Sequence, residues 1–376
     1  MTTINNPILP GFHPDPSICR AGEWYYIATS TFQWFPGVRI HRSRDLVNWE
    51  LCPSPLTRTS QLDVRGVPDS GGGWAPCLSH TPPQGDTPGR FWLIYTNVRS
   101  CGKALADFPN YLVTAESIDG PWSEPIYLNS SGFDPSLFHD DDGSHWLLGI
   151  LWDHRTGRNP FGGILLQQYD HDGRQLIGPV KNIYKGTDLG VTEGPHLYKR
   201  DGLYYLLVAE GGTSWEHAVT IARAPSIDGP YETDPDYPML TARDNPDLTI
   251  QKSGHASLTY ANDGTPILAH LGGRPIGSER RCILGRETSL QRCTWTDDGW
   301  LRLEGGGNEP QAAVEVPSDT PRIKASRDHT EQFDSTTLSP HFQSLRAPID
   351  SSWLRLDARA GFCRLHGRDS LFSLFD

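Results

Sequence analysis

Five residues that can carry chemistry recur along the chain at nearly constant spacing: Asp15, Trp74, Asp134, Glu193 and His255. Their separations are 59, 60, 59 and 62 residues, and each leads into a similar phrase of a short spacer, an apolar run, a turn and a second apolar run. Three of the five are carboxylic acids. If the repeats bring these acids together, mutual charge and burial push their pKa values apart, as general acid and base catalysis requires. The spacing therefore predicts a carboxylate-based catalytic site.

The phrases predict β-hairpins. Asp-Gly pairs at 142–143, 201–202 and 263–264 each separate two apolar runs, as tight hairpin turns with positive φ require. Similar segments later in several copies, such as HRSRDLVNW and TAESIDGPW, indicate third and fourth strands. About four strands in each of five repeats predict an all-β, five-bladed β-propeller, in which the starts of the innermost strands converge on the central axis. A two-sheet sandwich with a carbohydrate-binding face is the alternative, but it does not explain the regular period.

The composition agrees with this fold and limits the partners. The 38 glycines and 31 prolines among 376 residues suit many short strands joined by tight turns. A formal net charge of -12 argues against a nucleic acid or an anionic membrane as partner and favours a neutral substrate. Seven scattered cysteines indicate free thiols in a reducing compartment. No signal peptide or membrane-spanning run is visible, so we expect a cytoplasmic protein.

Each candidate residue also has a purely structural interpretation. An Asp before a proline is a common turn former, but the register of Asp15 with Asp134 and Glu193 argues for a shared functional position. His255 is interpreted either as a buried core histidine or as an axial residue that holds a metal ion or water beneath the site. Trp74 occupies an axial position, where its ring can stack on a sugar. The acidic run 140–142 is interpreted as a solvated hairpin tip, because its acids are adjacent rather than alternating as in an EF-hand loop.

Six ordered motifs resemble glycoside hydrolase family 43, in its β-xylosidase and α-L-arabinofuranosidase branch. They are NPILPGFHPDPSI, TSTFQWFPGVRIHRSRDLVNW, GFDPSLFHDDDG, TEGPHLYKRDG, GHASL and LGRET. The resemblance implies a five-bladed propeller followed by a β-sandwich. It also implies an inverting exo-β-1,4-xylosidase that releases xylose from the non-reducing end of xylo-oligosaccharides. An α-L-arabinofuranosidase or a bifunctional enzyme is the alternative within the family, and a non-catalytic sugar-binding propeller is the alternative from another class.

The resemblance also implies roles for single residues. Asp15 in HPDPS matches the general base, Glu193 in TEGPH the general acid, and Asp134 in FDPSL the third carboxylate, which orients the acid and raises its pKa. Inversion requires about 6.5 to 9.5 Å between the acid and the base, whereas retention requires about 5 to 5.5 Å. Residues from the first and fourth repeats, across a five-fold ring, fit the larger separation. The positions implied to contact sugar are Phe32, Trp74, Trp152, Thr213, His255 and Arg286.

The predicted division of the chain is a propeller catalytic domain at residues 1–318 and, at residues 319–376, a linker with the N-terminal fragment of a β-sandwich. The family's sandwich is longer than this fragment, and the chain ends on the apolar run DSLFSLFD, so we expect a truncated sandwich domain. Xylo-oligosaccharides are the expected partners, and homo-oligomer formation is left open. No cofactor is expected to be required, while a Ca²⁺ ion near the propeller axis, held by His255 through waters, is also left open.

Overall fold

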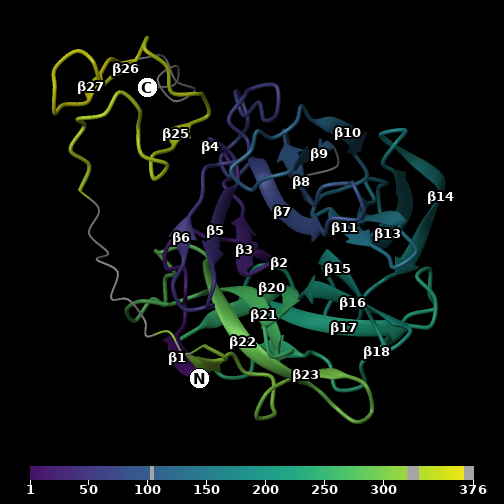
Figure 1. Cartoon of the computed structure of the whole chain (residues 1–376). Helices are drawn as coiled ribbons and strands as arrows, with labels where there is room; N and C mark the ends of the chain where they lie inside the picture. The colour runs from purple at the N-terminus through teal and green to yellow at the C-terminus, as the bar shows by residue number, and fades with distance from the viewer. Residues whose placement is uncertain (102–105, 319, 321–329, 368–376) are drawn as a thin grey trace.

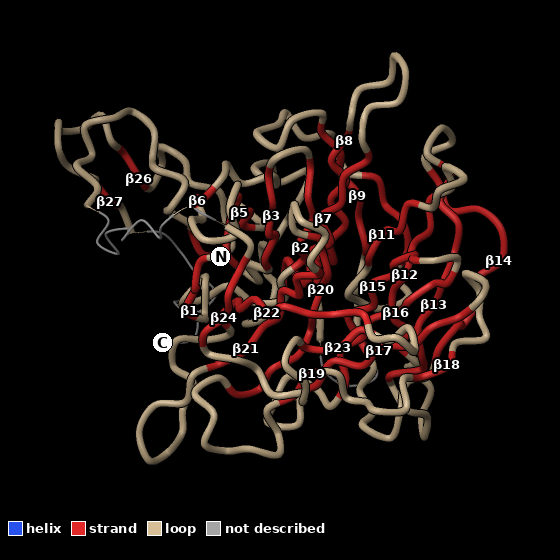
Figure 2. The backbone as a smooth tube through the Cα atoms, turned by 60° about the horizontal axis from the view of Figure 1, so that its bottom comes forward, coloured by secondary structure: helices blue, strands red, loops and turns tan. Residues whose placement is uncertain are grey.

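Five antiparallel sheets surround a central axis, in the order in which they follow one another along the chain (Figure 1). The structure is a computed structural model that describes residues 1–101, 106–318, 320 and 330–367. Strands and loops make up these ranges in Figure 2, and no helix found in them is long and apolar enough to cross a membrane. Apolar runs such as WYYIAT in β3 (Trp24–Thr29) are buried on both faces, because they form middle strands of stacked sheets.

The first three blades each contain four strands, ordered from the axis outwards. Blade 1 comprises β2 (Ser17–Ala21), β3 (Trp24–Thr29), β5 (Arg39–Ser43) and β6 (Glu50–Leu51). Blade 2 comprises β7 (Gly72–Thr81), β8 (Arg90–Val98), β9 (Asn110–Ala115) and β10 (Ile126–Asn129). Blade 3 comprises β11 (Ser136–His139), β12 (His145–Trp152), β13 (Phe161–Asp170) and β14 (Gln175–Tyr184).

Blades 4 and 5 complete the ring. Blade 4 comprises β15 (Glu193–Arg200), β16 (Leu203–Glu210), β17 (Ala218–Ala224) and β18 (Glu232–Thr233), with β19 (Leu240–Thr241) also paired to β17. Blade 5 comprises β20 (Gln251–Tyr260), β21 (Pro266–Gly273), β22 (Glu287–Trp295) and β23 (Leu301–Leu303). The prediction of an all-β, five-bladed propeller is confirmed.

The three predicted Asp-Gly hairpin turns join the first two strands of blades 3, 4 and 5. Gly143, Gly202 and Gly264 all have positive φ, which explains why glycine occupies these positions. The interpretation as a solvated hairpin tip holds for Asp141 and Asp142, which are exposed, but not for Asp140. Asp140 is nearly buried there, and its carboxylate accepts hydrogen bonds from Lys199 Nζ at 2.6 Å and the hydroxyl of Tyr204 at 2.7 Å. The tip therefore ties blade 3 to blade 4.

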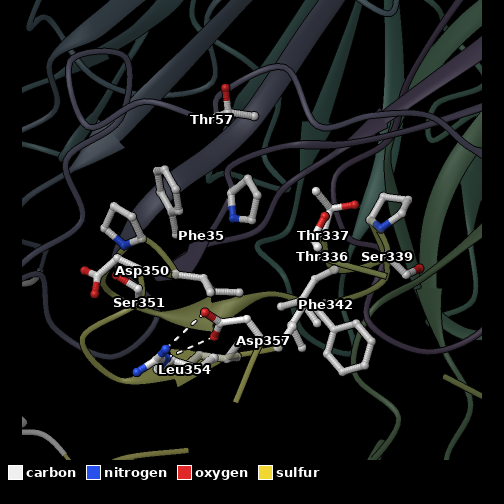
Figure 3. A pocket seen from close by; sticks show the side chains of 17 residues that line it. Phe35, Thr57, Thr336, Thr337, Ser339, Phe342, Asp350, Ser351, Leu354 and Asp357 are labelled. Atoms are coloured by element: carbon white, nitrogen blue, oxygen red, sulfur yellow. Dashed lines mark hydrogen bonds and ion pairs between the residues drawn. The ribbon is translucent and has the colours of Figure 1, made fainter. Parts of the chain in front are cut away.

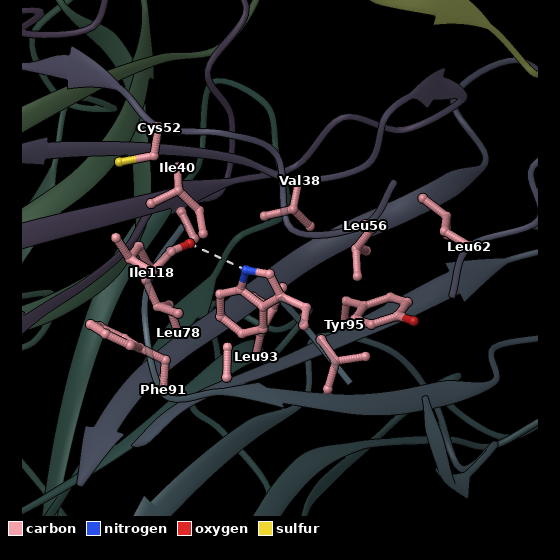
Figure 4. Packing of buried hydrophobic residues seen from close by; sticks show 14 of the residues in the cluster. Val38, Ile40, Cys52, Leu56, Leu62, Leu78, Phe91, Leu93, Tyr95 and Ile118 are labelled. Atoms are coloured by element: carbon pink, nitrogen blue, oxygen red, sulfur yellow. Dashed lines mark hydrogen bonds between the residues drawn. The ribbon is translucent and has the colours of Figure 1, made fainter. Parts of the chain in front are cut away.

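A cluster of buried apolar side chains fills each of the five interfaces between neighbouring blades. Figure 4 shows the one between blades 1 and 2, in which Ile40 lies on the side of blade 1 and Leu93 and Tyr95 on the side of blade 2. The ring is closed by the two ends of the propeller, since β1 (Thr2–Asn5) pairs antiparallel with β24 (Ala313–Val316). The closed ring fixes the distance of every innermost strand from the axis.

The segment 330–367 follows the propeller and contacts blade 1 (Figure 1). Its strand β25 (Ser344–Leu345) pairs with β4 (Trp34–Phe35), and β26 (Leu354–Arg355) pairs with β27 (Arg364–Leu365). A cavity of about 700 Å³ is lined by Phe35, Pro36 and Thr57 on one side and by this segment on the other, and its lining side chains are drawn in Figure 3. The predicted domain boundary adjoins residues 319 and 321–329, and the apolar run that ends the chain begins at residue 369. Both lie outside the described residues, so the boundary stays a prediction.

Candidate active site

One small cavity collects all five of the regularly spaced residues at one mouth of the central channel. It has a volume of about 70 Å³, well below the usual range of small-molecule sites, about 300 to 1,000 Å³. The other side chains that line it come from loops between strands and from the end of the loop before β22. The lining residues are Asp15, Phe32, Trp74, Phe133, Asp134, Glu193, Thr213, His255 and Arg286.

Three of the axial residues have left-handed backbone conformations. The φ angles are 55° at Asp15, 53° at Asp134 and 47° at His255. Asp and His enter this region more readily than most residues, but it still costs about 1 to 3 kcal/mol and is concentrated at functional sites. The backbone at these positions aims the side chains into the channel.

β-Bulges place the remaining axial residues. The register of β7 with β8 shifts after Trp74, and that of β15 with β16 shifts after Glu193. In β20, His255 lies between two register positions and is itself the extra residue. A bulge bends the strand and redirects a side chain, so these irregularities turn the tryptophan, the glutamate and the histidine towards the axis.

Asp15 lies in an environment that favours its ionised form. Arg286 Nη1 donates to Asp15 Oδ1 at 2.8 Å, and Ser30 Oγ donates to Asp15 Oδ2 at 2.6 Å. His255 Nδ1 lies 3.9 Å from the same Oδ1. Burial alone would raise the pKa of Asp15, but Arg286, His255 and Ser30 outweigh it, so the pKa is lowered. Asp15 is therefore a buried carboxylate at neutral pH.

Glu193 and Asp134 have the opposite electrostatic character. Burial, followed by the charge of Asp15, raises the pKa of Glu193 to about 8. Burial, followed by the charge of Glu193, also raises the pKa of Asp134. The backbone N–H of Gly194 donates to Asp134 Oδ2 at 3.1 Å, which favours the charged form of Asp134. The pair therefore keeps a proton at neutral pH. The shift of the Glu193 pKa comes from burial and the charge of Asp15, and the predicted influence of Asp134 is not among its causes.

Aromatic rings form one wall of the cavity. The rings of Phe32 and Trp74 lie 6.0 Å apart, and those of Trp74 and Phe133 lie 5.2 Å apart. The guanidinium of Arg286 lies 5.0 Å from the centre of the Phe32 ring. The indole N–H of Trp74 donates to the carbonyl of Ser70 at 2.6 Å, which fixes the plane of the ring. Apolar ring faces beside charged groups match the two kinds of surface of a sugar.

The C-terminal segment supports this wall through Arg346, which is buried. Its Nε donates to the carbonyl of Val67 at 2.7 Å, and its Nη2 lies 2.5 Å from Asp69 Oδ1. Its backbone N–H donates to the carbonyl of Gln33 at 2.9 Å, next to Phe32. The segment thus fastens the loop that carries Phe32 and the loop that precedes β7, the strand of Trp74.

Thr213 and Trp152, two of the residues predicted to contact sugar, lie differently with respect to the cavity. Thr213 lines the cavity as predicted. Trp152, at the end of β12, is not among the lining residues, and its ring packs 5.9 Å from Phe133 and 5.5 Å from Phe108. Its indole nitrogen is buried without a hydrogen-bond partner in the described part of the chain. Trp152 therefore packs behind Phe133 instead of lining this cavity, and its contact with sugar stays a prediction.

Sequence reasoning missed several residues that act on the site. Phe133 precedes Asp134 in the motif FDPSL, so its position was visible, but its role was not assigned. Ser30 and Arg346 carry no sequence signal, because each is defined by a contact with a distant segment. His217 is buried, its Nδ1 lies 3.2 Å from the carbonyl of Lys252, and it contributes to the lowered pKa of Asp15.

The donor set was tested for a metal site. Across the described ranges, no group of three or more His, Cys, Asp or Glu side chains is arranged to hold a metal ion. The site consists of three carboxyl groups around a cavity. Asp15 is ionised, and the pair of Glu193 and Asp134 keeps a proton. Such a set can activate water at one end and protonate a leaving oxygen at the other.

Comparisons with known proteins agree with this chemistry. The sequence model described as Glycosyl hydrolases family 43 matches residues 4–301, and that described as Beta xylosidase C-terminal Concanavalin A-like domain matches residues 330–376. The chain is 53% identical to the Xylosidase/arabinosidase 43B of Humicola insolens, over 100% of this chain and 68% of that protein. It is 51% identical to the Beta-xylosidase of Bacillus subtilis (strain 168), over 99% of this chain and 70% of that protein.

A solved structure is also similar. The crystal structure of xylan beta-1,4-xylosidase from Bacillus halodurans C-125 superposes with a TM-score of 0.93 at 58% identity. The match covers 98% of this chain and 69% of that one.

Proposed function

Since this chain belongs to glycosyl hydrolase family 43, it is a glycosidase, and we propose that it is an inverting exo-β-1,4-xylosidase that releases xylose from xylo-oligosaccharides. The observation that carries the proposal is the opposite shift of two buried carboxyls around one cavity. The pKa of Asp15 is lowered and that of Glu193 is raised to about 8, so each holds the protonation state that its role needs.

The reaction follows from these two states. Asp15 accepts a proton from a water molecule, whose oxygen forms a bond to the anomeric carbon. Glu193 donates its proton to the glycosidic oxygen as the bond from that oxygen to the anomeric carbon breaks. Asp134 accepts the hydrogen bond of the Gly194 N–H, directly after Glu193 in the chain, and so helps to orient the acid. Asp15 then loses its proton to solvent and Glu193 regains one.

The shape of the cavity supports removal of one terminal sugar. Its small volume of about 70 Å³ and its aromatic wall suit a single small ring better than a long chain. Arg286 and Thr213 present donors towards the cavity, and His255 lies beside Asp15. These contacts would bind the hydroxyls of the terminal sugar.

The test is the first-formed product from xylobiose, observed by NMR. The proposal requires α-xylose to appear first and to mutarotate afterwards. A β-xylose first product would overturn the inverting assignment. Asp15→Ala and Glu193→Ala should each abolish xylose release, and a wild-type protein that binds xylobiose without hydrolysing it would support the sugar-binding alternative.

An α-L-arabinofuranosidase activity, alone or in addition, is the second candidate. The xylosidase/arabinosidase name of the relative at 53% identity favours it. Comparing kcat/KM for 4-nitrophenyl β-D-xyloside with that for 4-nitrophenyl α-L-arabinofuranoside separates the two. We expect the xyloside to be preferred, and a preference for the arabinofuranoside would reverse the order of the two activities.

Catalysis as proposed needs no metal ion, because the two carboxyls move both protons. Activity should therefore survive exhaustive chelation. Loss of activity that added Ca²⁺ restores would instead place an ion next to His255, held through waters.

A further inference from the structure

Glu210 is a buried acid that lies outside the cavity. It is on β16, the strand that pairs with the start of β15, where the proposed general acid Glu193 lies. It is the last residue of β16, its exposure is 0%, and it is not among the cavity-lining residues. Ala209, its neighbour in the chain, pairs in register with Glu193. A carboxylate buried this deeply is costly unless hydrogen bonds compensate for the lost water.

Four hydrogen bonds satisfy the two oxygens of Glu210. Oε1 accepts from the backbone N–H of Thr187 at 2.7 Å and from the hydroxyl of Thr192 at 3.0 Å. Oε2 accepts from the hydroxyl of Thr187 at 2.8 Å and from that of Thr220 at 2.6 Å. Three threonines are therefore arranged around one carboxylate.

Two of these threonines lie near opposite ends of the loop 185–192, which joins β14 to β15. Thr192 is the residue directly before Glu193, so one end of the loop is continuous with the proposed acid. The carboxylate of Glu210 thus binds both ends of the loop and fixes the residue at which β15 begins.

The loop needs such a clamp because its backbone is strained. Val191 has a φ of 52°, which a β-branched residue rarely adopts. Gly186 has a φ of 83°, and a Cβ there would lie 1.8 Å from the hydroxyl oxygen of Thr192 and 2.7 Å from Glu210 Oε1. The close contact leaves no room for a side chain at 186. The loop conformation and the clamp therefore depend on each other.

We propose that Glu210 is a positioning residue for Glu193: through Thr187 and Thr192 it holds the start of β15 where the acid reaches the leaving oxygen. The proposal rests on the proposed function, since it assumes that Glu193 is the general acid. Misplacing a catalytic group by about 1 Å can cost about 100-fold in rate, so a loosened loop should slow proton donation strongly.

The experiment compares two substrates that differ in their need for an acid. Xylobiose requires protonation of its leaving oxygen, whereas the phenolate of 2,4-dinitrophenyl β-xyloside departs without a proton. For Glu210→Gln we expect kcat on xylobiose to fall about 10-fold to 100-fold, and kcat on the dinitrophenyl substrate to fall less than about threefold. Equal losses on both substrates would overturn the proposal.

Asp140→Asn is the matched control, because Asp140 is a nearly buried carboxylate that accepts from Lys199 and Tyr204 at a hairpin tip outside the site. Asp140→Asn should not lower kcat on xylobiose more than kcat on the dinitrophenyl substrate. If Glu210→Gln does not fold, Thr192→Val carries the test, with Thr192→Ser as the variant that restores the hydroxyl. Thr192→Val should show the same selective loss and Thr192→Ser should recover it, and a Thr192→Val enzyme with wild-type selectivity would contradict the role.

Glu193→Gln, measured in parallel, separates this proposal from the one on which it rests. If Glu193 is the acid, its variant shows a larger selective loss on xylobiose than Glu210→Gln. If Glu193→Gln shows no selectivity between the substrates, the assignment of the acid fails. If Glu193→Gln is selective and Glu210→Gln is not, only the positioning role fails.

Discussion

Arg286 Nη1 and Asp15 Oδ1 lie 2.8 Å apart, although 271 residues separate them in the chain. This ion pair joins the loop before β2 to the loop before β22 across the closure of the ring. It opposes the effect of burial and keeps Asp15 ionised. The ionisation of Asp15, the proposed base, therefore depends on Arg286, a residue of the last blade.

Replacing Arg286 should impair the base. Arg286→Gln removes the positive charge, so the pKa of Asp15 rises and the acidic limb of the pH profile of kcat/KM moves to higher pH. We expect kcat/KM at neutral pH to fall about 10-fold to 100-fold, as for loss of a hydrogen bond to a charged group. Arg292→Gln, which removes a guanidinium of β22 that pairs with Glu304, is the control and should leave the profile in place.

The raised pKa of Glu193 predicts a basic limb. A general acid must be protonated, so kcat/KM should decline as the pH rises through about 8. Glu193→Gln should remove this limb and lower kcat on xylobiose by about 10² to 10⁴. A pH profile that stays flat from 6 to 10 in the wild type would refute the assignment.

The same shift has a consequence for stability. The folded pKa of Glu193, about 8, is above its ordinary value of 4.5, so the folded state binds more protons between these pH values. The stability linked to Glu193 is therefore complete below about pH 4.5 and is lost as the pH rises through 8. Relative to the wild type, Glu193→Gln should gain stability from pH 5 to pH 9, which denaturant unfolding at both pH values measures. A constant difference would contradict the shift.

Alanine substitutions of the two tryptophans that were predicted to contact sugar should differ in their effects on KM and stability. Trp74→Ala removes part of the cavity wall and should raise KM for xylobiose at least about 10-fold, because stacking on an aromatic face is lost. Trp152→Ala removes packing behind Phe133 and should lower the free energy of unfolding by about 3 kcal/mol with a smaller change in KM. Steady-state kinetics and thermal unfolding of both variants check this, and a larger KM effect at Trp152 would support its predicted contact with sugar.

The C-terminal segment should influence substrate binding through Arg346. Arg346→Ala releases Val67 and Asp69, which precede Trp74, so KM for xylobiose should rise about threefold to tenfold. Arg355→Ala is the matched control, because Arg355 lies in the same segment and pairs with the exposed Asp357. Equal effects of the two substitutions would show that the segment acts in a general way rather than through Arg346.

Local periodicity was enough to locate the three carboxyls and the blades. Asp15, Asp134 and Glu193 begin repeated phrases, and the geometry of a propeller then requires them to meet. The hydrogen bond from Ser30 and the packing of Trp152 against Phe133 could not be predicted, because they depend on how loops fold over one another. The left-handed backbone of Asp15 was also hidden, since the proline that follows an Asp usually favours extended conformations.

The pairing of β1 with β24 has a consequence for the synthesis of the protein. Thr2 leaves the ribosome 314 residues before Val316, its partner in the ladder. At about 5 to 20 residues per second, the first strand waits roughly 16 to 63 s for that partner. During this interval Ile4 and Ile27 lack the apolar surface of blade 5 that later covers them. The nascent chain therefore exposes apolar surface and an unpaired strand, to which chaperones can bind, until the last blade is complete.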